Sequence, residues 1–591
     1  MLTNSILYCL FALFFFCILL FAKKDNTSDH SAAAWIVIHS GVLMWINNMI
    51  AGIYALVSIP FTLLSVSVAY FFLSMLGIIY IRKNGIQKYK WCIWDFLFML
   101  FIIGVALSVG IRFHTKKLLI CDVTGDSCMH FHYALNVSNH GIVKGEMFFA
   151  PVNNGLFISI VKPLVKPYQY YKAFFAMGIM MLALSGCAFY AIISDTMKGL
   201  LSRVFGLIVS LLYMLGYPLH NHLMGFCYLG MSITIIALLI FFVKLYLDNV
   251  MHNNWAICLM MLGCFSLVMC YMLFAPVIYI ALFISLAIGS YKKTSMRCFI
   301  KTVLEIFLIP CVLGIYYCYF CFFKGRGLSI GDAITNNGGT RGHFYSHLLI
   351  LFPATVYYLV TDIKKKQHLE LTVFLLCVAL FAALFLLLVY TDNISIYYYS
   401  KVPYLLWLMM SFSSFYGLKY MLDTDKNAFV SYTMVICFLF FVWIFNINGR
   451  LACKANEMGY GLFSEFYRTV SFGIYDDNIN LIAGFGPYDL YKVNIFRYIT
   501  ENLKDETVPV LGDFTNYLDV YWCEDFTGKD LSDYYYWTSG IETVVEKIAT
   551  DKETNYVVLL YNTSAYNDYN TIWQKFDTVF ENTAGCILKI V

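Results

Sequence analysis

The stretch LTVFLLCVALFAALFLLLVY, residues 371–390, decides the fold class of this 591-residue chain. It runs for a full twenty residues without a charged side chain, which is the length that an α-helix needs to cross a hydrocarbon core about 30 Å thick. Similar blocks recur along the chain, so we predict a polytopic α-helical membrane protein. The predicted spans, fourteen in all, lie near residues 2–22, 33–57, 61–81, 92–112, 173–193, 201–217, 223–243, 255–274, 276–290, 302–322, 346–361, 369–390, 402–422 and 428–446.

The composition of the whole chain agrees with this prediction. Hydrophobic residues make up 60% and charged residues 13%, and the mean hydropathy is +0.70, whereas soluble proteins carry about 25% charged residues. A soluble enzyme, a disordered chain and a fibrous repeat are therefore excluded. Residues 447–591 are acidic, with 11 Lys+Arg against 21 Asp+Glu. Because nucleic-acid phosphates require Lys and Arg, we predict no nucleic-acid partner.

Basic residues in the short loops predict the orientation in the membrane, since such loops face the cytoplasm. This places the N-terminus, the segments 113–172 and 323–345, and the C-terminal region on the extracytoplasmic side. Abundant Lys, Ile, Tyr and Asn suggest an AT-rich genome, so we expect a bacterial cell membrane. With fourteen spans, the basic clusters on one side are Lys23 and Lys24, Arg82 and Lys83, Lys198 and Arg203, Lys292 and Lys293, and Lys364 to Lys366.

Three regions are expected from the pattern of spans and loops. Residues 1–91 would form three additional N-terminal transmembrane helices, and residues 92–446 a transmembrane core with a large extracytoplasmic loop at 113–172. Residues 447–591 would form a small extracytoplasmic α/β domain. Its predicted helices are 488–504, 541–550 and 572–581, and its predicted strands are 508–511, 556–561 and 586–591. Alternating strands and helices favour a mainly parallel sheet.

The loop CDVTGDSCMHFHYALNVSNHGIVKGEMFFAPVNNGLF, residues 121–157, is the most informative polar segment. Residues 127–139 can form a short amphipathic helix on the membrane surface, with Asp126 and Ser127 as N-cap residues and Gly141 as its end. One interpretation of Asp126 is that it only caps this helix. The other is that a carboxylate at the membrane boundary acts as a general base on an acceptor hydroxyl or amine.

Asp126, Ala134 and Gly141, followed by a Phe/Pro stretch entering the next span, resemble the first extracytoplasmic loop of GT-C superfamily glycosyltransferases. The most similar members that we can name are the protein O-mannosyltransferase-like and aminoarabinose transferase-like enzymes. The resemblance implies a sugar donor linked to a polyprenyl phosphate, an extracytoplasmic acceptor and a catalytic role for Asp126. Asp122 remains a competing base. The chain departs from the family at Ser127, where Glu is frequent, and at Val152, where a second Pro is usual.

A second, weaker resemblance lies at residues 397–405, YYYSKVPYL, which is similar to the Arg-Tyr-Leu-x-Pro entry to a late span in the same superfamily. It implies that Lys401 and Tyr399 contact the carrier phosphate, since a Lys ammonium pairs well with a phosphate. The alternative is an aromatic belt with a snorkelling lysine. Further basic residues on the predicted outer side, which oppose the positive-inside rule and suit an anionic lipid, are Lys162, Arg326 and Arg341.

Other polar side chains on the outer side are candidates for contacts with substrate. These are His130, Asn153, Asn154, His220 and His222. His220 and His222 would sit in a very short outer turn, and a metal site there would need further ligands. The sequence leaves open whether these histidines share a divalent cation with the loop aspartates. We predict no other cofactor.

Two other functions remain open at this stage. A lipid or polysaccharide transporter would show related halves with interrupted helices, and no clear internal repeat is present. Charges deep inside the spans, typical of ion-coupled transport, are few. A membrane sensor would bind its ligand in the C-terminal domain, and its function would not depend on the loop carboxylates.

Overall fold

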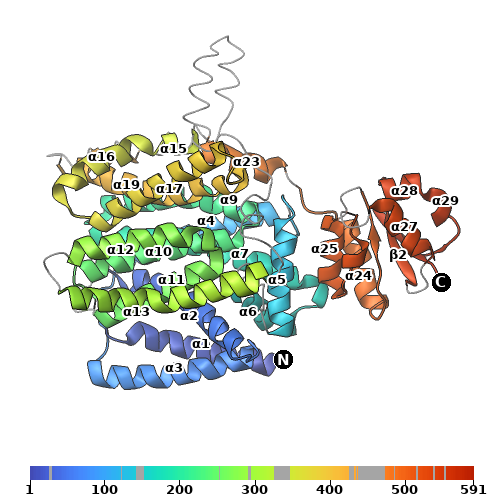
Figure 1. Cartoon of the computed structure of the whole chain (residues 1–591), viewed down its shortest axis with the longest axis horizontal. Coiled ribbons are helices and arrows are strands. Elements are labelled where there is room, and N and C mark those ends of the chain that lie inside the picture. Colours follow the sequence, from blue (N-terminus) through green and yellow to red (C-terminus); the bar gives the residue numbers. More distant parts are fainter. Residues whose placement is uncertain are drawn as a thin grey trace, which may run out of the picture.

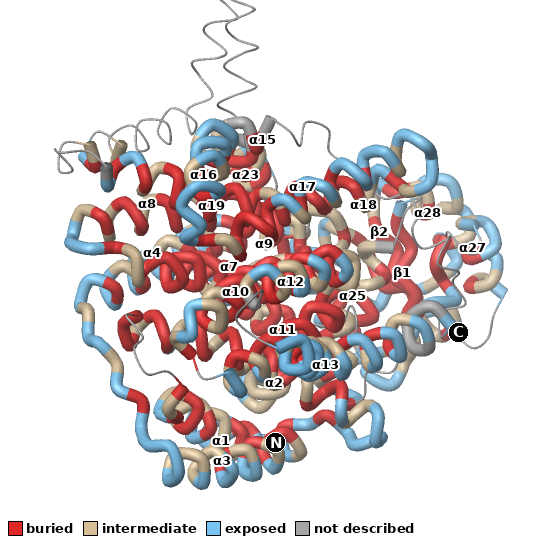
Figure 2. The backbone as a smooth tube through the Cα atoms, turned by 60° about the vertical axis from the view of Figure 1, so that its left-hand side comes forward, coloured by how far each residue is buried: buried red, intermediate tan, exposed pale blue. Residues whose placement is uncertain are grey.

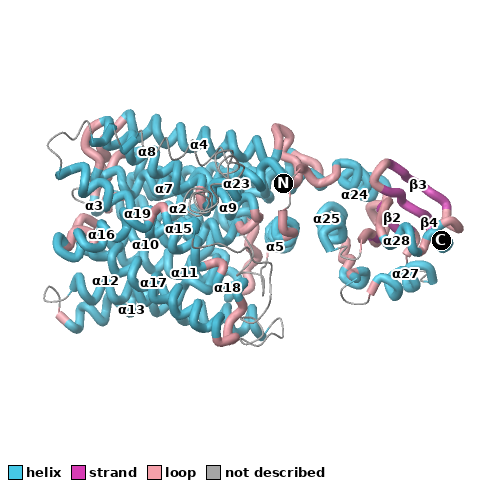
Figure 3. The backbone as a smooth tube through the Cα atoms, turned by 90° about the horizontal axis from the view of Figure 1, so that it is seen from above, coloured by secondary structure: helices cyan, strands magenta, loops and turns pink. Residues whose placement is uncertain are grey.

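The computed structural model describes most of the chain. The described residues are 1–24, 30–121, 123–141, 152–251, 253–290, 295–324, 346–424, 431–433, 435–436, 473–484, 486–513, 517–536, 540–550 and 554–591. Within these ranges the strands occur only in the last part of the chain, beside a large bundle of helices (Figure 3).

The bundle is built mainly from long apolar helices, as the sequence predicts. Ten segments of the described residues are long and apolar enough to cross a membrane. The longer helices are α1 (Leu2–Phe21), α2 (Ala32–Leu56), α3 (Leu63–Asn84), α4 (Ile93–His114), α7 (Tyr170–Ile193), α8 (Leu200–Leu215), α10 (Cys227–Leu247), α11 (Asn253–Tyr271), α12 (Ala275–Ser290), α13 (Met296–Ile315), α16 (Phe352–Lys365), α17 (Leu369–Tyr390) and α19 (Val402–Thr424).

Shorter helices connect these elements. They are α5 (Asp126–His140), α6 (Val152–Val161), α9 (Tyr217–Leu223), α15 (Ser346–Leu349), α18 (Ile396–Tyr399) and α23 (Gly473–Gly484), with 3₁₀ turns at Lys162–Leu164, Pro167–Gln169, Ser194–Thr196 and Met272–Phe274 and a π-helix at Tyr316–Lys324. Thirteen of the fourteen predicted spans coincide with helices, and the last, 428–446, lies mostly outside the described residues. The multi-pass membrane fold is thus confirmed, while the count of fourteen and the orientation stay predictions.

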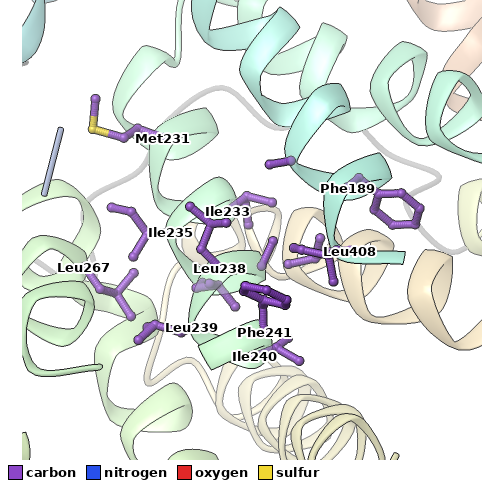
Figure 4. Close-up of a cluster of buried hydrophobic side chains, with 14 of the residues drawn as sticks. Phe189, Met231, Ile233, Ile235, Leu238, Leu239, Ile240, Phe241, Leu267 and Leu408 are labelled. Atoms are coloured by element: carbon purple, nitrogen blue, oxygen red, sulfur yellow. The ribbon is translucent and has the colours of Figure 1, made fainter. Parts of the chain in front are cut away.

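The centre of the bundle is α10, which is buried on nearly every side. Its Leu238 and Phe241 lie in one apolar cluster with Phe189 of α7, Leu267 of α11 and Leu408 of α19 (Figure 4). The outermost helices, such as α3 and α13, instead carry many exposed residues (Figure 2). Large apolar side chains are among them, including Leu76 of α3 and Leu308 of α13. This distribution is typical of helices whose outer faces contact lipid tails.

One buried ion pair joins three helices at the end of the bundle where α4 begins. Asp95, in the first turn of α4, accepts hydrogen bonds from the Arg203 guanidinium of α8 and, at 3.0 Å, from the Tyr190 hydroxyl of α7. The side chain of Asp95 is only 2% exposed. This pair therefore fixes the relative positions of α4, α7 and α8.

The C-terminal region contains a small sheet flanked by helices (Figure 1). Its helices are α24 (Leu490–Asn502), α25 (Tyr517–Thr527), α27 (Ile541–Thr550), α28 (Ser564–Asp568) and α29 (Asn570–Trp573), with a 3₁₀ turn at Ser532–Tyr534. The strands are β1 (Val510–Leu511), β2 (Tyr556–Leu560), β3 (Asp577–Asn582) and β4 (Gly585–Lys589), in the order β1-β2-β4-β3. The small α/β domain is therefore present, with helix 541–550 at its predicted bounds.

Two predictions about this sheet are wrong. Only β1 and β2 run parallel, whereas β2 with β4 and β3 with β4 are antiparallel. The predicted helix 572–581 ends early as α29, and its second half forms the edge strand β3. Phe576, Val579 and Phe580 have helical spacing, but the two-residue turn at Thr583 and Ala584 pairs β3 with the buried β4, and this pairing determines the structure.

Candidate functional site

The loop helix α5 begins one residue earlier than predicted, and its N-cap is Gly125 instead of Asp126. Gly125 has φ +79°, a left-handed conformation that glycine adopts without strain. Asp126 is consequently the first residue of the helix, and its backbone N–H donates to Thr124 Oγ1 at 3.2 Å. The Thr124 hydroxyl donates in turn to the Met224 carbonyl at 2.9 Å, which ties the start of α5 to the end of α9.

The helix α5 ends at Gly141, as predicted, and lies between the bundle and the C-terminal domain (Figure 1). One face packs on α6, and the other packs on α25 of the C-terminal domain. At the second contact the rings of Phe131 and Trp522 are 5.7 Å apart, and His132 Nδ1 is 2.8 Å from Asp525 Oδ1. The C-terminal domain thus covers one face of the loop helix.

Lys401 lies immediately before α19 and is 3% exposed. Its ammonium is enclosed by aromatic rings, with Nζ 3.5 Å from the ring centroid of Phe226 and 4.5 Å from that of Tyr397. Such cation–π contacts stabilise a desolvated cation. Among the described residues, no carboxylate lies within 4 Å of this Nζ. The structure therefore holds a buried positive charge at the same end of the bundle as the start of α5.

Asp126 and Lys401 are close enough for each charge to influence the other. Burial raises the pKa of the Asp126 carboxyl, and the Thr124 hydrogen bond and the charge of Lys401 oppose that rise. Burial lowers the pKa of Lys401 to about 8, and the charge of Asp126 opposes the fall. Burial, followed by the charge of Asp126, also raises the pKa of Tyr397. These three residues form one electrostatic unit, which we name the Asp126–Lys401 site.

His130 belongs to the same site. It lies one helical turn after Asp126 on α5, so that both side chains are on one face of the helix. Its ring is fully buried, 4.4 Å from the ring of Tyr228, and within the described part of the chain neither ring nitrogen has a hydrogen-bond partner. Burial, and then the charge of Lys401, lowers the pKa of His130 to about 3. The imidazole is therefore neutral and can accept or donate one hydrogen bond.

Other residues predicted for the site lie elsewhere. Lys162 bonds to Asn139 near the end of α5, thirteen residues and therefore about 20 Å along the helix from Asp126. Tyr399 packs in a separate apolar cluster with Phe385 of α17, while Tyr397 is the tyrosine beside Lys401.

The two asparagines of α6 contact other parts of the bundle or have no described partner. Asn153 Oδ1 accepts a 2.8 Å hydrogen bond from the Asn47 amide of α2, which ties α6 to the N-terminal helices. The Asn154 side-chain nitrogen is buried, and the described residues offer it no partner.

His220 and His222, which were expected in a very short turn, lie on the short helix α9 instead. Pro218 stands in the first turn of this helix, a position that proline favours. His220 Nδ1 is 2.9 Å from Asn478 Oδ1 of α23, and His222 lines a small, mostly apolar cavity together with Asn221 and Phe226. Within the described residues, no group of three His, Cys, Asp or Glu side chains could hold a metal ion.

Three further predicted residues, Asp122, Arg326 and Arg341, lie outside the described residues. No sequence motif marks Phe226 or Tyr228 as part of the site, and none predicts the contact of Asp525 with α5. Tyr397, in contrast, could be predicted as a neighbour of Lys401, because it stands one helical turn before Lys401 in the aromatic run 397–399.

The burial of Asp525 beside His132 predicts a pH-dependent stability. Burial raises the pKa of the Asp525 carboxyl to about 7, although His132 opposes this rise. Because a raised pKa favours the protonated folded state, the contribution is full near pH 4 and is lost as the pH rises to about 7. We expect wild type to lose about 2 kcal/mol relative to Asp525→Asn between pH 5 and 8. Thermal unfolding of both proteins in detergent measures this difference, and parallel pH profiles would contradict it.

Comparison with solved structures gives a match over most of the chain at low sequence identity. The chain is similar to ArnT from Cupriavidus metallidurans, in its crystal structure bound to undecaprenyl phosphate. The TM-score is 0.45 at 9% sequence identity, and the match covers 83% of this chain and 98% of that chain. No family model and no curated protein sequence matches this chain.

Proposed function

We propose that this protein is a membrane glycosyltransferase that moves a sugar from a polyprenyl-phosphate carrier to an extracytoplasmic acceptor, such as a cell-envelope glycan, lipid or protein. The observation that carries the proposal is the buried ammonium of Lys401, which lies among aromatic rings and is electrostatically coupled to the carboxyl of Asp126. A cation that is out of water favours an anionic ligand, and a phosphate would form charge-assisted hydrogen bonds with it.

The two charges suit the two sides of a glycosyl transfer. Lys401 would bind the phosphate of the carrier and stabilise the negative charge that grows on it as the bond between the anomeric carbon and the phosphate oxygen breaks. Asp126 would accept the proton of the acceptor hydroxyl or amine while its oxygen or nitrogen bonds to the anomeric carbon. The products are the glycosylated acceptor, the free polyprenyl phosphate and a proton passed through Asp126.

The raised pKa of Asp126 supports this assignment, since a more basic carboxylate is a better proton acceptor. Neutral His130, one turn further along α5, could accept a hydrogen bond from a sugar hydroxyl in the same space. The C-terminal domain, which covers α5, would contribute to the acceptor side, and its acidic charge suits a basic or neutral acceptor. In this proposal the site lies on the extracytoplasmic face of a bacterial cell membrane.

The carrier site is tested by the lipids that remain bound to the purified protein. Wild type, Lys401→Met and Lys162→Met are purified in mild detergent, and polyprenyl phosphates and their sugar adducts are quantified by mass spectrometry. Loss of one charge-assisted contact is expected to lower the bound carrier about tenfold or more in Lys401→Met. Lys162→Met is the matched control, because Lys162 is a lysine near the other end of α5.

Equal amounts of carrier in all three proteins would show that Lys401 does not bind the carrier phosphate. Only bulk phospholipid in wild type would instead favour a transporter or sensor function. The mass of a sugar adduct, if one is retained by wild type, would also identify the class of sugar.

A further inference from the structure

A second cavity system lies at the opposite end of the bundle from the Asp126–Lys401 site. An apolar groove of about 460 Å³ separates the N-terminal helices from the core, and a polar pocket of about 690 Å³ adjoins it. Tyr80, Trp255 and Cys258 line both, so the two cavities lie side by side. The junction lies where α3 ends and α11 begins, and the polar pocket also touches Asn249 after the end of α10.

The groove has the dimensions of a lipid chain. The end of α1 together with Ala22, and the helices α3 and α11, each line it over eight residues, and α2 lines it over twelve, from Val42 to Ile53. At 1.5 Å per residue the groove is about 10–16 Å long, close to the thickness of one leaflet of the hydrocarbon core. Ile53 and Leu76 on its lining are exposed, so that a chain could enter sideways from the membrane.

The pocket at the end of the groove offers hydrogen-bond donors. Four exposed asparagines line it: Asn84, Asn249, Asn253 and Asn254. The indole Nε1 of Trp255 is buried, and the described residues provide no acceptor for it. A ligand with oxygen acceptors placed directly beside an apolar chain would satisfy this arrangement.

The charges around the pocket favour an anionic ligand. Arg82 and Lys83 occupy the last turn of α3, immediately before Asn84. The Lys24 ammonium lies 5.3 Å from the ring centroid of Trp255, and it donates to the backbone carbonyls of Leu19 and Ala22. Asp248 precedes Asn249 in the sequence, and Lys301 and Glu305 of opposite charge line the neighbouring pocket, so the three basic residues named here leave an excess of positive charge. The basic character matches the headgroup phosphate of a membrane lipid.

We propose that this cavity binds one glycerophospholipid with an anionic headgroup. An acyl chain would fill the groove between the N-terminal helices and α11, and the phosphate would accept hydrogen bonds from Trp255 and the asparagines. The lipid would thereby fill the space that separates α1 and α3 from the core. This site is independent of the proposed sugar transfer, because it lies at the other end of α10.

The test uses native mass spectrometry of the full chain after exposure to vesicles of equal parts phosphatidylglycerol and phosphatidylcholine. Cys258→Trp fills the junction of groove and pocket, and Cys311→Trp places the same side chain on α13, at a cysteine that is also exposed. Wild type and Cys311→Trp are expected to retain one phosphatidylglycerol. Retention by Cys258→Trp should fall about tenfold, the loss expected for two displaced methylene groups.

A second pair of variants tests the headgroup without altering the groove. Asn254→Asp adds a negative charge to the pocket and should reduce retention of phosphatidylglycerol but not of phosphatidylcholine. Asn393→Asp makes the same change at an exposed position in the loop after α17 and should have no effect. Equal retention of both lipids by wild type, or equal retention by Cys258→Trp and Cys311→Trp, would overturn the proposal. Retention of a polyprenyl phosphate that Cys258→Trp abolishes would also overturn it.

Discussion

Replacing Asp126 with asparagine is expected to lower sugar transfer by about 10²–10⁴-fold, the usual contribution of a general base. Asparagine keeps the size of the side chain but cannot take the proton from the acceptor. The helix start should stay intact, because the backbone N–H of residue 126 still donates to Thr124 Oγ1 and the asparagine side-chain oxygen can accept a hydrogen bond as the carboxylate does. The measurement is release of free carrier by chromatography and mass spectrometry, from a panel of polyprenyl phosphates bearing a hexose, an N-acetylhexosamine or an amino-pentose.

Asp122→Asn is the matched comparison for this experiment, since Asp122 is the other acidic residue before α5. Binding of the carrier should be unchanged in Asp126→Asn, which separates a chemical role from a binding role. If Asp126→Asn transfers sugar at the wild-type rate, Asp126 is not the general base. Loss of transfer in Asp122→Asn alone would move the catalytic assignment to that residue.

The largest expected effect on stability comes from replacing Arg203 with leucine. This change leaves the buried carboxylate of Asp95 without its ion-pair partner, and a buried charge stripped of its partner typically costs about 3–5 kcal/mol. We expect Arg203→Leu to unfold at a clearly lower temperature than wild type in detergent. Lys301→Leu is the control, because Lys301 pairs with Glu305 at an exposed site, where an ion pair contributes about 0–1 kcal/mol.

The double variant Arg203→Leu with Asp95→Leu tests the physical reason. If the single variant is destabilised by an unpaired charge, removal of that charge should restore most of the lost stability. A double variant that is less stable than Arg203→Leu would mean that Asp95 acts mainly through its hydrogen bond with Tyr190.

Much of the fold could be predicted from the sequence because a bilayer imposes a simple length rule. Apolar blocks such as residues 371–390 have few alternatives to a membrane-spanning helix, and most predicted bounds are close to those observed. The short, partly polar segments were harder to predict. The residues of β3 have helical spacing, and only pairing with β4 makes them a strand.

The candidate site was less accessible to sequence reasoning. Asp126 and Lys401 could each be selected from local patterns, but nothing in the sequence shows that their charges interact. Phe226, which lies against Lys401, follows α9 in a segment without any polar motif. The family resemblance points to Tyr399, two positions before Lys401, whereas the helical turn brings Tyr397, four positions before it, into contact with the ammonium.

The cover of α5 by α25 also has a consequence for the order in which the protein is made. His132 and Asp525 are 393 residues apart, which at about 5–20 residues per second corresponds to roughly 20–80 s of synthesis. During that interval Trp522 has not been synthesised, so Phe131 cannot pack against it, and the loop helix α5 has only its contacts with the bundle. A ribosome that stops before α25 would leave a protein with its helices in place and this face of α5 bare.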